Sequence, residues 1–159
     1  MARTSGILGV NHIAVFTSRL EEAEQHYASL FGASVLFRGT THKGEWVAID
    51  GDAAWEDVRR RGLRVEATFL RAGGVTIIAA DEPSPGKDGP LNHVGVGVGD
   101  AEFKRIRDTV RSMGLREHES EANSFKFRDA LGVLWEVSRG MEAAHRPPRK
   151  LDLGTGRVG

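Results

Sequence analysis

The stretch that decides the fold is Gly132-Val133-Leu134-Trp135-Glu136-Val137-Ser138. Successive side chains of a strand point to opposite faces, so the odd-numbered residues of this stretch form an apolar packing face. Glu136 lies in the middle of the other face. Burying a carboxylate costs free energy unless its charge is compensated. The stretch therefore predicts a strand whose carboxylate has partners elsewhere in the chain.

Two other strand-like runs offer such partners, Val-Asn-His-Ile-Ala-Val-Phe at 10–16 and Leu-Asn-His-Val-Gly-Val-Gly-Val at 91–98. Each contains Asn-His followed by a β-branched residue, and each leads into a helix signal. A lone histidine is more often a core or surface residue. Two histidines and one carboxylate on strands, however, are typical of a facial metal triad that leaves three coordination positions open. We therefore predict that His12, His93 and Glu136 bind one divalent metal ion.

The chain repeats one order of elements: a strand, a helix and three strands. In the first half, a capping box of Ser18 and Glu21 predicts the start of a helix, and Gly32 its end. In the second half, Asp100 is expected to cap a helix that Gly114 closes. The expected strands are 7–16, 33–38, 64–71, 74–80, 91–98, 115–119, 124–128 and 133–139. A short extended piece at 46–49 and a surface helix at 52–61 lengthen the first half.

Sequence matches within the repeat align the candidate ligands. The Asn-His pairs at 11–12 and 92–93 correspond, and the pattern F-x-x-A-x-G-V occurs at 69–75 and 127–133. This alignment places Ile78 opposite Glu136. The repeat thus offers four equivalent positions, occupied by His12, Ile78, His93 and Glu136, of which three carry metal-ligating side chains.

Small or apolar side chains flank the candidate ligands along their strands. Gly95 and Gly97 share a face with His93, Ala14 shares one with His12, and Leu134 shares one with Glu136. With Ile78, these residues are expected to line a substrate cavity. His42 and His118, near strand ends, are the candidates for a catalytic acid or base.

Composition limits the partners of this chain of 159 residues. Lys and Arg total 22, as do Asp and Glu, so nothing in the net charge favours nucleic acid or an anionic membrane as a partner. The chain has neither an apolar window long enough to span a membrane nor a signal-peptide core, so a soluble cytoplasmic protein is expected. The absence of cysteine excludes thiolate ligands. The remaining ligand types admit Fe(II), Mn(II), Zn(II), Ni(II) or Co(II).

Residues 7 to 140 resemble the vicinal oxygen chelate superfamily of glyoxalases, bleomycin resistance proteins and extradiol dioxygenases. The motifs that carry the resemblance are Asn-His-Ile-Ala-Val at 11–15, Leu-Phe-Gly at 30–32, Asn-His-Val-Gly-Val at 92–96 and Gly-Val-Leu-Trp-Glu-Val at 132–137. The resemblance implies an α+β fold of two tandem βαβββ modules with pseudo-twofold symmetry, forming a cup-shaped, partly open β-barrel with flanking helices. One domain would span 1–140, with modules at 7–81 and 91–140 and a linker at 82–90. An extended or disordered tail would follow at 141–159.

The resemblance also implies metal ligands and chemistry. Family members carry histidine ligands on the first and fifth strands and a glutamate ligand on the eighth, which correspond to His12, His93 and Glu136. Glyoxalase I and methylmalonyl-CoA epimerase have a fourth ligand where this chain has Ile78, whereas extradiol dioxygenases and fosfomycin-modifying enzymes use three. The dioxygenases also use a strand tyrosine, but the one tyrosine here, Tyr27, lies in a predicted helix. The run at 124–127 is similar to the fosfomycin enzymes, whose threonine is replaced here by Ala14.

The expected function is that of a divalent-metal enzyme that chelates vicinal oxygens of a small molecule. The three open positions favour dioxygenase-type chemistry. The alternatives are a metal-dependent lyase or isomerase, a fosfomycin-type transferase, or a drug-binding protein of the bleomycin resistance type without catalysis. The resemblance further implies a homodimer.

Overall fold

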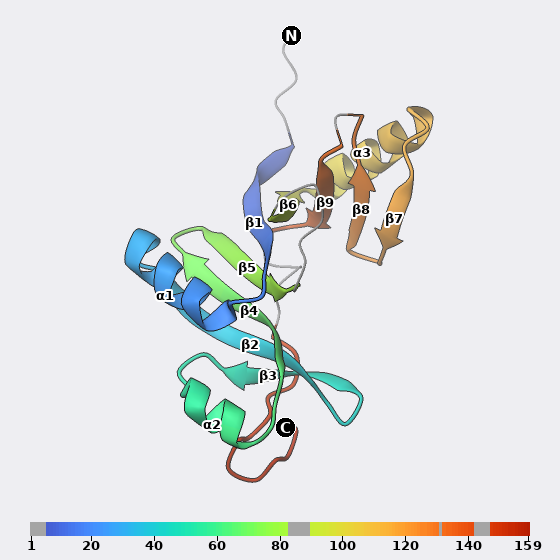
Figure 1. The fold of residues 1–159 in the computed structure, drawn as a ribbon. Coiled ribbons are helices and arrows are strands. Elements are labelled where there is room, and N and C mark those ends of the chain that lie inside the picture. The colour runs from blue at the N-terminus through green and yellow to red at the C-terminus, as the bar shows by residue number, and fades with distance from the viewer. Residues whose placement is uncertain (1–5, 83–89, 131, 142–146) are drawn as a thin grey trace. The chain divides into compact units, whose positions relative to one another are not determined.

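A computed structural model describes residues 6–82, 90–130, 132–141 and 147–159, and the expected linker at 82–90 lies almost entirely outside them. The chain forms two compact units, each discontinuous in sequence. The first unit comprises residues 1–13 and 92–146, and the second comprises 14–91 and 147–159. The elements, labelled in Figure 1, are β1 (Ile7–Thr17), α1 (Leu20–Phe31), β2 (Ser34–His42), β3 (Glu45–Asp50), α2 (Trp55–Arg60), β4 (Val65–Ala72), β5 (Val75–Asp81), β6 (Leu91–Val98), α3 (Asp100–Ser112), β7 (Glu117–Ser120), β8 (Ser124–Arg128) and β9 (Leu134–Arg139).

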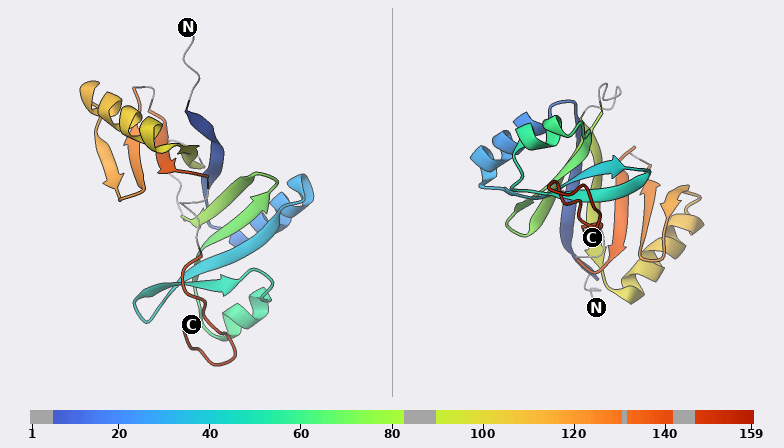
Figure 2. Two further views of the ribbon diagram at one scale, coloured as in Figure 1. Left: turned by 180° about the vertical axis from the view of Figure 1, so that it is seen from behind. Right: turned by 90° about the horizontal axis from the view of Figure 1, so that it is seen from below.

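The first unit contains the strand order β1-β6-β9-β8-β7, to which β1 contributes residues 7–13. Strand β6 runs parallel to β9, and β9, β8 and β7 pair antiparallel. Helix α3 covers one face of these strands, as both Figure 1 and the left view of Figure 2 show. Its apolar residues Phe103 and Val110 pack with Phe125 of β8 and Val137 of β9.

The two faces of β9 are those expected from the sequence. Val137 and Trp135 pack in the core beneath α3. Glu136 points to the other face, where it lies beside Gly95 of β6 and Lys126 of β8 in the strand register. The alternation of apolar and polar residues thus puts the carboxylate on the sheet face opposite the helix.

The second unit contains the order β3-β2-β4-β5 followed by residues 14–17 of β1. Helix α1 packs on β4, β5 and β2, and Leu70 and Ile77 form the core beneath it with Ala33. Neighbouring side chains of a strand alternate, so Ile78 faces away from that core; its cross-strand neighbour on β4 is Phe69. The extended piece expected at 46–49 is the full strand β3, paired with β2 from Asp50 to Glu45.

The α+β class is confirmed, whereas both predicted helix N-caps are wrong. Arg19, not Ser18, precedes α1, and no side chain caps that helix. The Arg19 N–H instead donates to Thr17 Oγ1 at 3.1 Å. Gly99 precedes α3, and Asp100 lies in its first turn, where its carboxylate binds Arg139. The predicted ending of α1 is confirmed, because Gly32 adopts the left-handed conformation with φ 62°.

Residues 147–159 are part of the second unit. The Ala48 N–H of β3 donates to the Arg149 carbonyl, and the Leu151 N–H donates to the Ala48 carbonyl. Leu151 is buried in a core cluster with Val47 and Ile49 of β3 and Val58 of α2. The segment thus lies alongside β3, which is the edge strand in the strand order of the sheet.

None of the described helices is long and apolar enough to cross a membrane.

Candidate metal centre

Three neighbouring strands of the first unit each supply one predicted ligand. His12 lies on β1, His93 on β6 and Glu136 on β9, strands that are adjacent in the order β1-β6-β9. All three residues are buried, with 1%, 6% and 8% of their surface exposed. The structure therefore brings together residues separated by 81 and 43 positions in the sequence, as the repeat predicts.

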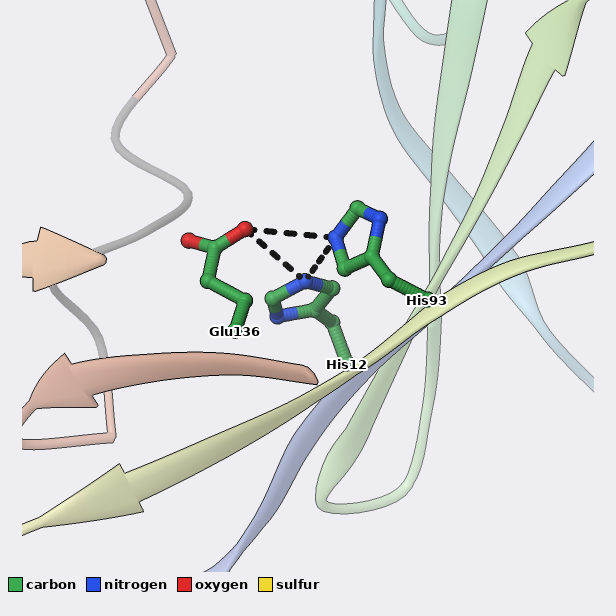
Figure 3. A group of neighbouring side chains, drawn as sticks. All are labelled: His12, His93 and Glu136. Atoms are coloured by element: carbon green, nitrogen blue, oxygen red, sulfur yellow. Dashed lines mark hydrogen bonds and ion pairs between the residues drawn. The ribbon is translucent and has the colours of Figure 1, made fainter. Parts of the chain in front are cut away.

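The candidate ligand atoms lie close together, as Figure 3 shows. The two imidazole Nε2 atoms lie 2.7 Å apart. Glu136 Oε2 lies 3.2 Å from His93 Nε2 and 3.6 Å from His12 Nε2. Among the described residues these three form the one group whose ligand atoms could hold a metal ion together.

The spacing of the three atoms fits a divalent metal. Ligands about 2.1 Å from a metal and at right angles to each other lie about 3 Å apart. The three observed separations are close to that value. Each residue also presents a donor that divalent transition metals accept, so the donor set and its geometry both fit the group.

Glu136 is ionised despite its burial. Burial raises the pKa of the carboxyl, but the neighbouring His12 and His93 side chains lower it, and the charge of Lys126 lowers it as well. The lowering effects win, and the pKa of Glu136 is held well below its usual range. A buried negative charge between two imidazoles is a favourable place for a cation.

The other ring nitrogen of His12 is held by a chain of buried polar groups. His12 Nδ1 lies 2.8 Å from Asn11 Oδ1, and Asn11 Nδ2 donates to Ser138 Oγ at 3.3 Å. Asn11 and Ser138 are fully buried. A β-carbon at Gly95 would lie 2.0 Å from the His12 ring, so the absence of a side chain there makes room for the imidazole.

The second ring nitrogen of His93 is in a different environment. This atom, Nδ1, is buried and has no hydrogen-bond partner among the described residues. The two ligand histidines, although equivalent in the repeat, therefore differ in their second ring nitrogen.

A polar hollow of about 250 Å³ opens beside Glu136 in the first unit. Lys126 contributes to its lining, with Nζ 3.7 Å from Glu136 Oε2 and 2.7 Å from Glu119 Oε2. The remaining lining residues are Glu121, Ala122, Asn123 and Ser124. The ligand carboxylate is thus reachable from a space bounded by charged and polar side chains.

The other predicted site residues are distributed over both units. In the first unit, Gly97 packs against Gly140 and Met141, Leu134 is half-buried on β9, and His118 is exposed at an irregularity in the pairing of β7. In the second unit, Ala14 is buried, Ile78 is half-buried, and His42 lies at the end of β2 with a buried Nε2. Their assignment to the substrate cavity or to catalysis stays a prediction.

Three residues at the site were not assigned a role from the sequence. Lys126 is the direct cross-strand neighbour of Glu136, a relation that only the register of β8 and β9 reveals. Ser138 lies two residues after Glu136 and therefore shares its strand face, and its bond to Asn11 joins β9 to β1. The repeated Asn-His pair draws attention to Asn11. The sequence does not show, however, which of the two asparagines hydrogen-bonds to the histidine that follows it.

Comparison with known proteins agrees with the fold. The sequence model of the Glyoxalase/Bleomycin resistance protein/Dioxygenase superfamily matches residues 9–137. Methylmalonyl-CoA epimerase from Mycobacterium tuberculosis is a similar solved structure, with 19% identity over 88% of this chain and 93% of that one and a TM-score of 0.53. A comparison with curated proteins gave no match.

Two dioxygenases have the same fold over part of their length. A variant of homoprotocatechuate 2,3-dioxygenase from B. fuscum matches 92% of this chain at 12% identity, with a TM-score of 0.58. A catechol 2,3-dioxygenase matches 100% of it at 15% identity, with a TM-score of 0.56. This chain spans 36% and 52% of their respective lengths. Such identities show a shared fold, and the family match covers most of the sequence: the chain belongs to the glyoxalase, bleomycin resistance protein and dioxygenase superfamily.

Proposed function

We propose that this protein is a divalent-metal enzyme that binds vicinal oxygens of a small-molecule substrate at His12, His93 and Glu136. One observation carries the proposal: three buried ligand atoms from three strands converge at separations that suit a single metal ion. A protein that only sequesters a ligand has no need of such a triad. The ionised state of Glu136 supports the same conclusion, because it supplies the negative charge that a dication needs.

The residues of the site have different roles in this proposal. A bound divalent metal would act as a Lewis acid and, if redox-active, would allow oxygen chemistry. His12 and His93 offer neutral nitrogen donors, and Glu136 offers the anionic oxygen. Lys126 places a positive charge at the edge of the hollow beside Glu136, where it can meet an oxygen of a bound substrate. The hollow of about 250 Å³ is smaller than the usual ligand pocket of roughly 300–1,000 Å³, so it favours a small substrate.

Within this proposal we favour dioxygenase-type chemistry. Three protein ligands leave three positions of an octahedral metal, enough for a bidentate substrate and dioxygen together. The similarity in fold to two solved dioxygenases is in keeping with this choice. A metal-dependent isomerase or lyase is the competing activity, as the similarity to an epimerase indicates.

Metal content tests the site itself. Protein purified without added metal should contain about one equivalent of a transition metal by elemental analysis, and His12→Ala should lose most of it. The exposed residue His118 provides the matched control, since His118→Ala should retain the metal. Full occupancy in His12→Ala would mean that the metal is bound elsewhere.

Oxygen dependence tests the reaction class. The metal-free protein is reconstituted anaerobically with Fe(II), Mn(II) or Zn(II) and offered catechols, vicinal diols, α-keto aldehydes and epoxides. Dioxygenase chemistry requires oxygen uptake with a redox-active metal and none with Zn(II). Turnover without oxygen, or equal turnover with Zn(II), would assign the protein to isomerase, lyase or transferase chemistry instead.

A further inference from the structure

The two ligand histidines occupy equivalent positions in the repeat, and each follows an asparagine. Their surroundings nevertheless differ. Asn11 Oδ1 lies 2.8 Å from His12 Nδ1, whereas His93 Nδ1 has no hydrogen-bond partner among the described residues, the preceding Asn92 included. This asymmetry is a property of side chains that the repeat does not predict.

The hydrogen-bonding capacity of Asn11 fixes the state of His12. An amide has one oxygen that accepts and one nitrogen that donates. Asn11 Nδ2 donates to Ser138 Oγ, and Asn11 Oδ1 is the atom turned toward His12. An accepting oxygen requires that His12 Nδ1 carry the proton, and a neutral imidazole then has an unprotonated Nε2. That Nε2 is the atom that faces His93 and Glu136.

We propose that Asn11, held by Ser138, is a positioning residue that fixes the tautomer of His12 and makes His12 the better prepared of the two histidine ligands. The proposal deepens the proposed function, because it rests on His12 being a metal ligand. Hydrogen bonds to the second nitrogen of a ligand histidine fix its orientation and tautomer and raise its basicity.

The state of His93 follows from that of His12. With an unprotonated Nε2, His12 can only accept in the contact of 2.7 Å between the two rings, so His93 Nε2 carries the proton there. His93 Nδ1 is then unprotonated and needs no acceptor, which agrees with the lack of a partner at that atom. To ligate a metal through Nε2, His93 must give up this proton, whereas His12 needs no change.

The packing around His12 reinforces its fixed position. A β-carbon at Gly95 would lie 2.1 Å from His12 Nδ1 and 2.6 Å from Asn11 Oδ1. Only a glycine leaves room for both partners of this hydrogen bond. The bond is also inaccessible to solvent, since 1% of His12 and 2% of Asn11 are exposed. Water therefore does not compete for the donor or the acceptor.

The test compares Asn11→Leu with Asn92→Leu, its repeat equivalent. The first reading is made on the full-length, metal-free protein labelled with ¹⁵N in histidine, at a pH of about 8, which lies above the pKa of about 6.5 of histidine in model peptides. Long-range ¹H–¹⁵N spectra should show a protonated Nδ1 at His12 in the wild type and in Asn92→Leu. That signature should be lost in Asn11→Leu and retained in Asn11→Asp, whose carboxylate can only accept.

The second reading is the dissociation constant for Zn(II), measured by competition with a chelator. Asn11→Leu should bind Zn(II) about 10- to 100-fold more weakly than the wild type. Asn92→Leu should match the wild type, and Asn11→Asp should bind at least as tightly as the wild type. Ser138→Ala should weaken binding less than Asn11→Leu, because the amide is then free to turn but can still accept.

The proposal is overturned if Asn11→Leu keeps both the tautomer and the Zn(II) affinity of the wild type, or if Asn92→Leu weakens binding equally. If Asn11→Leu does not fold, Asn11→Asp decides, because a His12 protonated at Nε2 in that variant contradicts the proposal. If the wild type binds no Zn(II), the metal centre of the proposed function is refuted. The tautomer spectra of the metal-free protein then still decide whether Asn11 controls His12.

Discussion

At the scale of single residues, the charge next to the candidate metal is set by Glu136 and its cross-strand neighbour Lys126. The ammonium group lies 3.7 Å from the ligand oxygen of Glu136 and also binds the exposed carboxylate of Glu119. It adds to the lowering of the Glu136 pKa, to which His12 and His93 contribute more. The same positive charge repels a dication, so Lys126 has opposite effects on the ligand and on the metal.

Lys126→Met should therefore bind Zn(II) more tightly than the wild type. At about 4 Å, two charges near a protein surface interact by up to about 4 kcal/mol, and partial solvent exposure and Glu119 reduce this here. We expect an increase in affinity of about three- to tenfold, with a higher pKa of Glu136 in the metal-free protein. Lys126→Arg keeps the charge and should resemble the wild type. Weaker Zn(II) binding by Lys126→Met would show that Lys126 mainly holds Glu136 in position.

Gly95→Ala should disrupt the site by direct overlap. Its methyl group would lie 2.0 Å from His12 Cε1, so the imidazole must move away from the position where its Nε2 meets the other ligands. We expect loss of metal and destabilisation by about 1–3 kcal/mol, the usual cost of overpacking. Gly99→Ala is the matched control, because a β-carbon there meets no atom within 4 Å. Elemental analysis and denaturant unfolding of both variants would decide, and a Gly95→Ala protein with full metal content would contradict the expectation.

The convergence of the three candidate ligands could be predicted from the sequence, and the residues that contact them could not. His12, His93 and Glu136 are side chains of unusual type at positions where a repeat makes them equivalent. The roles of Asn11 and Lys126 depend on contacts between strands, which need the register and the rotamers as well as the pattern. The repeat was even misleading in one respect, since it treats Asn11 and Asn92 alike.

At the scale of secondary structure elements, a buried ion pair ties α1 to its surroundings in the second unit. Glu24 of α1 accepts two hydrogen bonds from the Arg38 guanidinium of β2, at 2.7 and 2.8 Å. It also accepts hydrogen bonds from Thr68 of β4 and Trp55 of α2. Four elements are thus joined through one carboxylate. Burial raises the pKa of Glu24. These hydrogen bonds and the charge of Arg38 lower it by more, so the net shift is downward.

The lowered pKa makes stability depend on pH in a defined direction. A carboxyl whose pKa is lower in the folded than in the unfolded state stabilises the protein fully above its unfolded pKa, about 4.5, and loses that contribution as the pH falls through the folded pKa. Glu24→Gln should cost about 3–5 kcal/mol at neutral pH, because Arg38 is left without its counter-charge. The difference from wild type should shrink in acid.

Urea unfolding of wild type and Glu24→Gln between neutral pH and pH about 3 measures this dependence. Glu21→Gln is the control, because Glu21 pairs with Arg59 at the surface, where an ion pair contributes little. A constant difference between wild type and Glu24→Gln across this range would contradict the expected role of the Glu24 charge.

Elements were predicted best where one local signal governs them. The alternation in β6 and β8 defines both strands to the residue, and Gly32 ends α1 because it adopts a left-handed conformation. The predicted N-caps were wrong because the side chains form other bonds. Asp100, for example, binds Arg139 instead of the helix backbone. For β3 the sequence predicts only a short extended piece, because its pairing with β2 is a tertiary contact that its own residues do not reveal.

At the scale of the whole molecule, segments of the two units alternate along the sequence. Residues 1–13 belong with 92–146, and residues 147–159 belong with 14–91. His12 is therefore part of the same unit as His93 and Glu136, although residues 14–91 separate it from them in sequence. The last segment of the chain, in turn, completes a core formed by residues of the first half, with Leu151 buried against Val47, Ile49 and Val58. Neither relation follows from a division of the sequence into consecutive modules.

This arrangement predicts that the end of the chain affects stability without affecting the metal centre. Removing residues 147–159 exposes the core that Leu151 covers and frees the edge of β3, so the thermal unfolding temperature should fall by several degrees. Leu151→Ala should cost about 2–5 kcal/mol, whereas Leu30→Ala, at a position that is 58% exposed, should cost little. Below the unfolding transition, the shortened protein should still bind Zn(II) with the affinity of the wild type, because all three ligands belong to the other unit. Loss of Zn(II) binding at an unchanged unfolding temperature would show that residues 147–159 act on the metal centre directly.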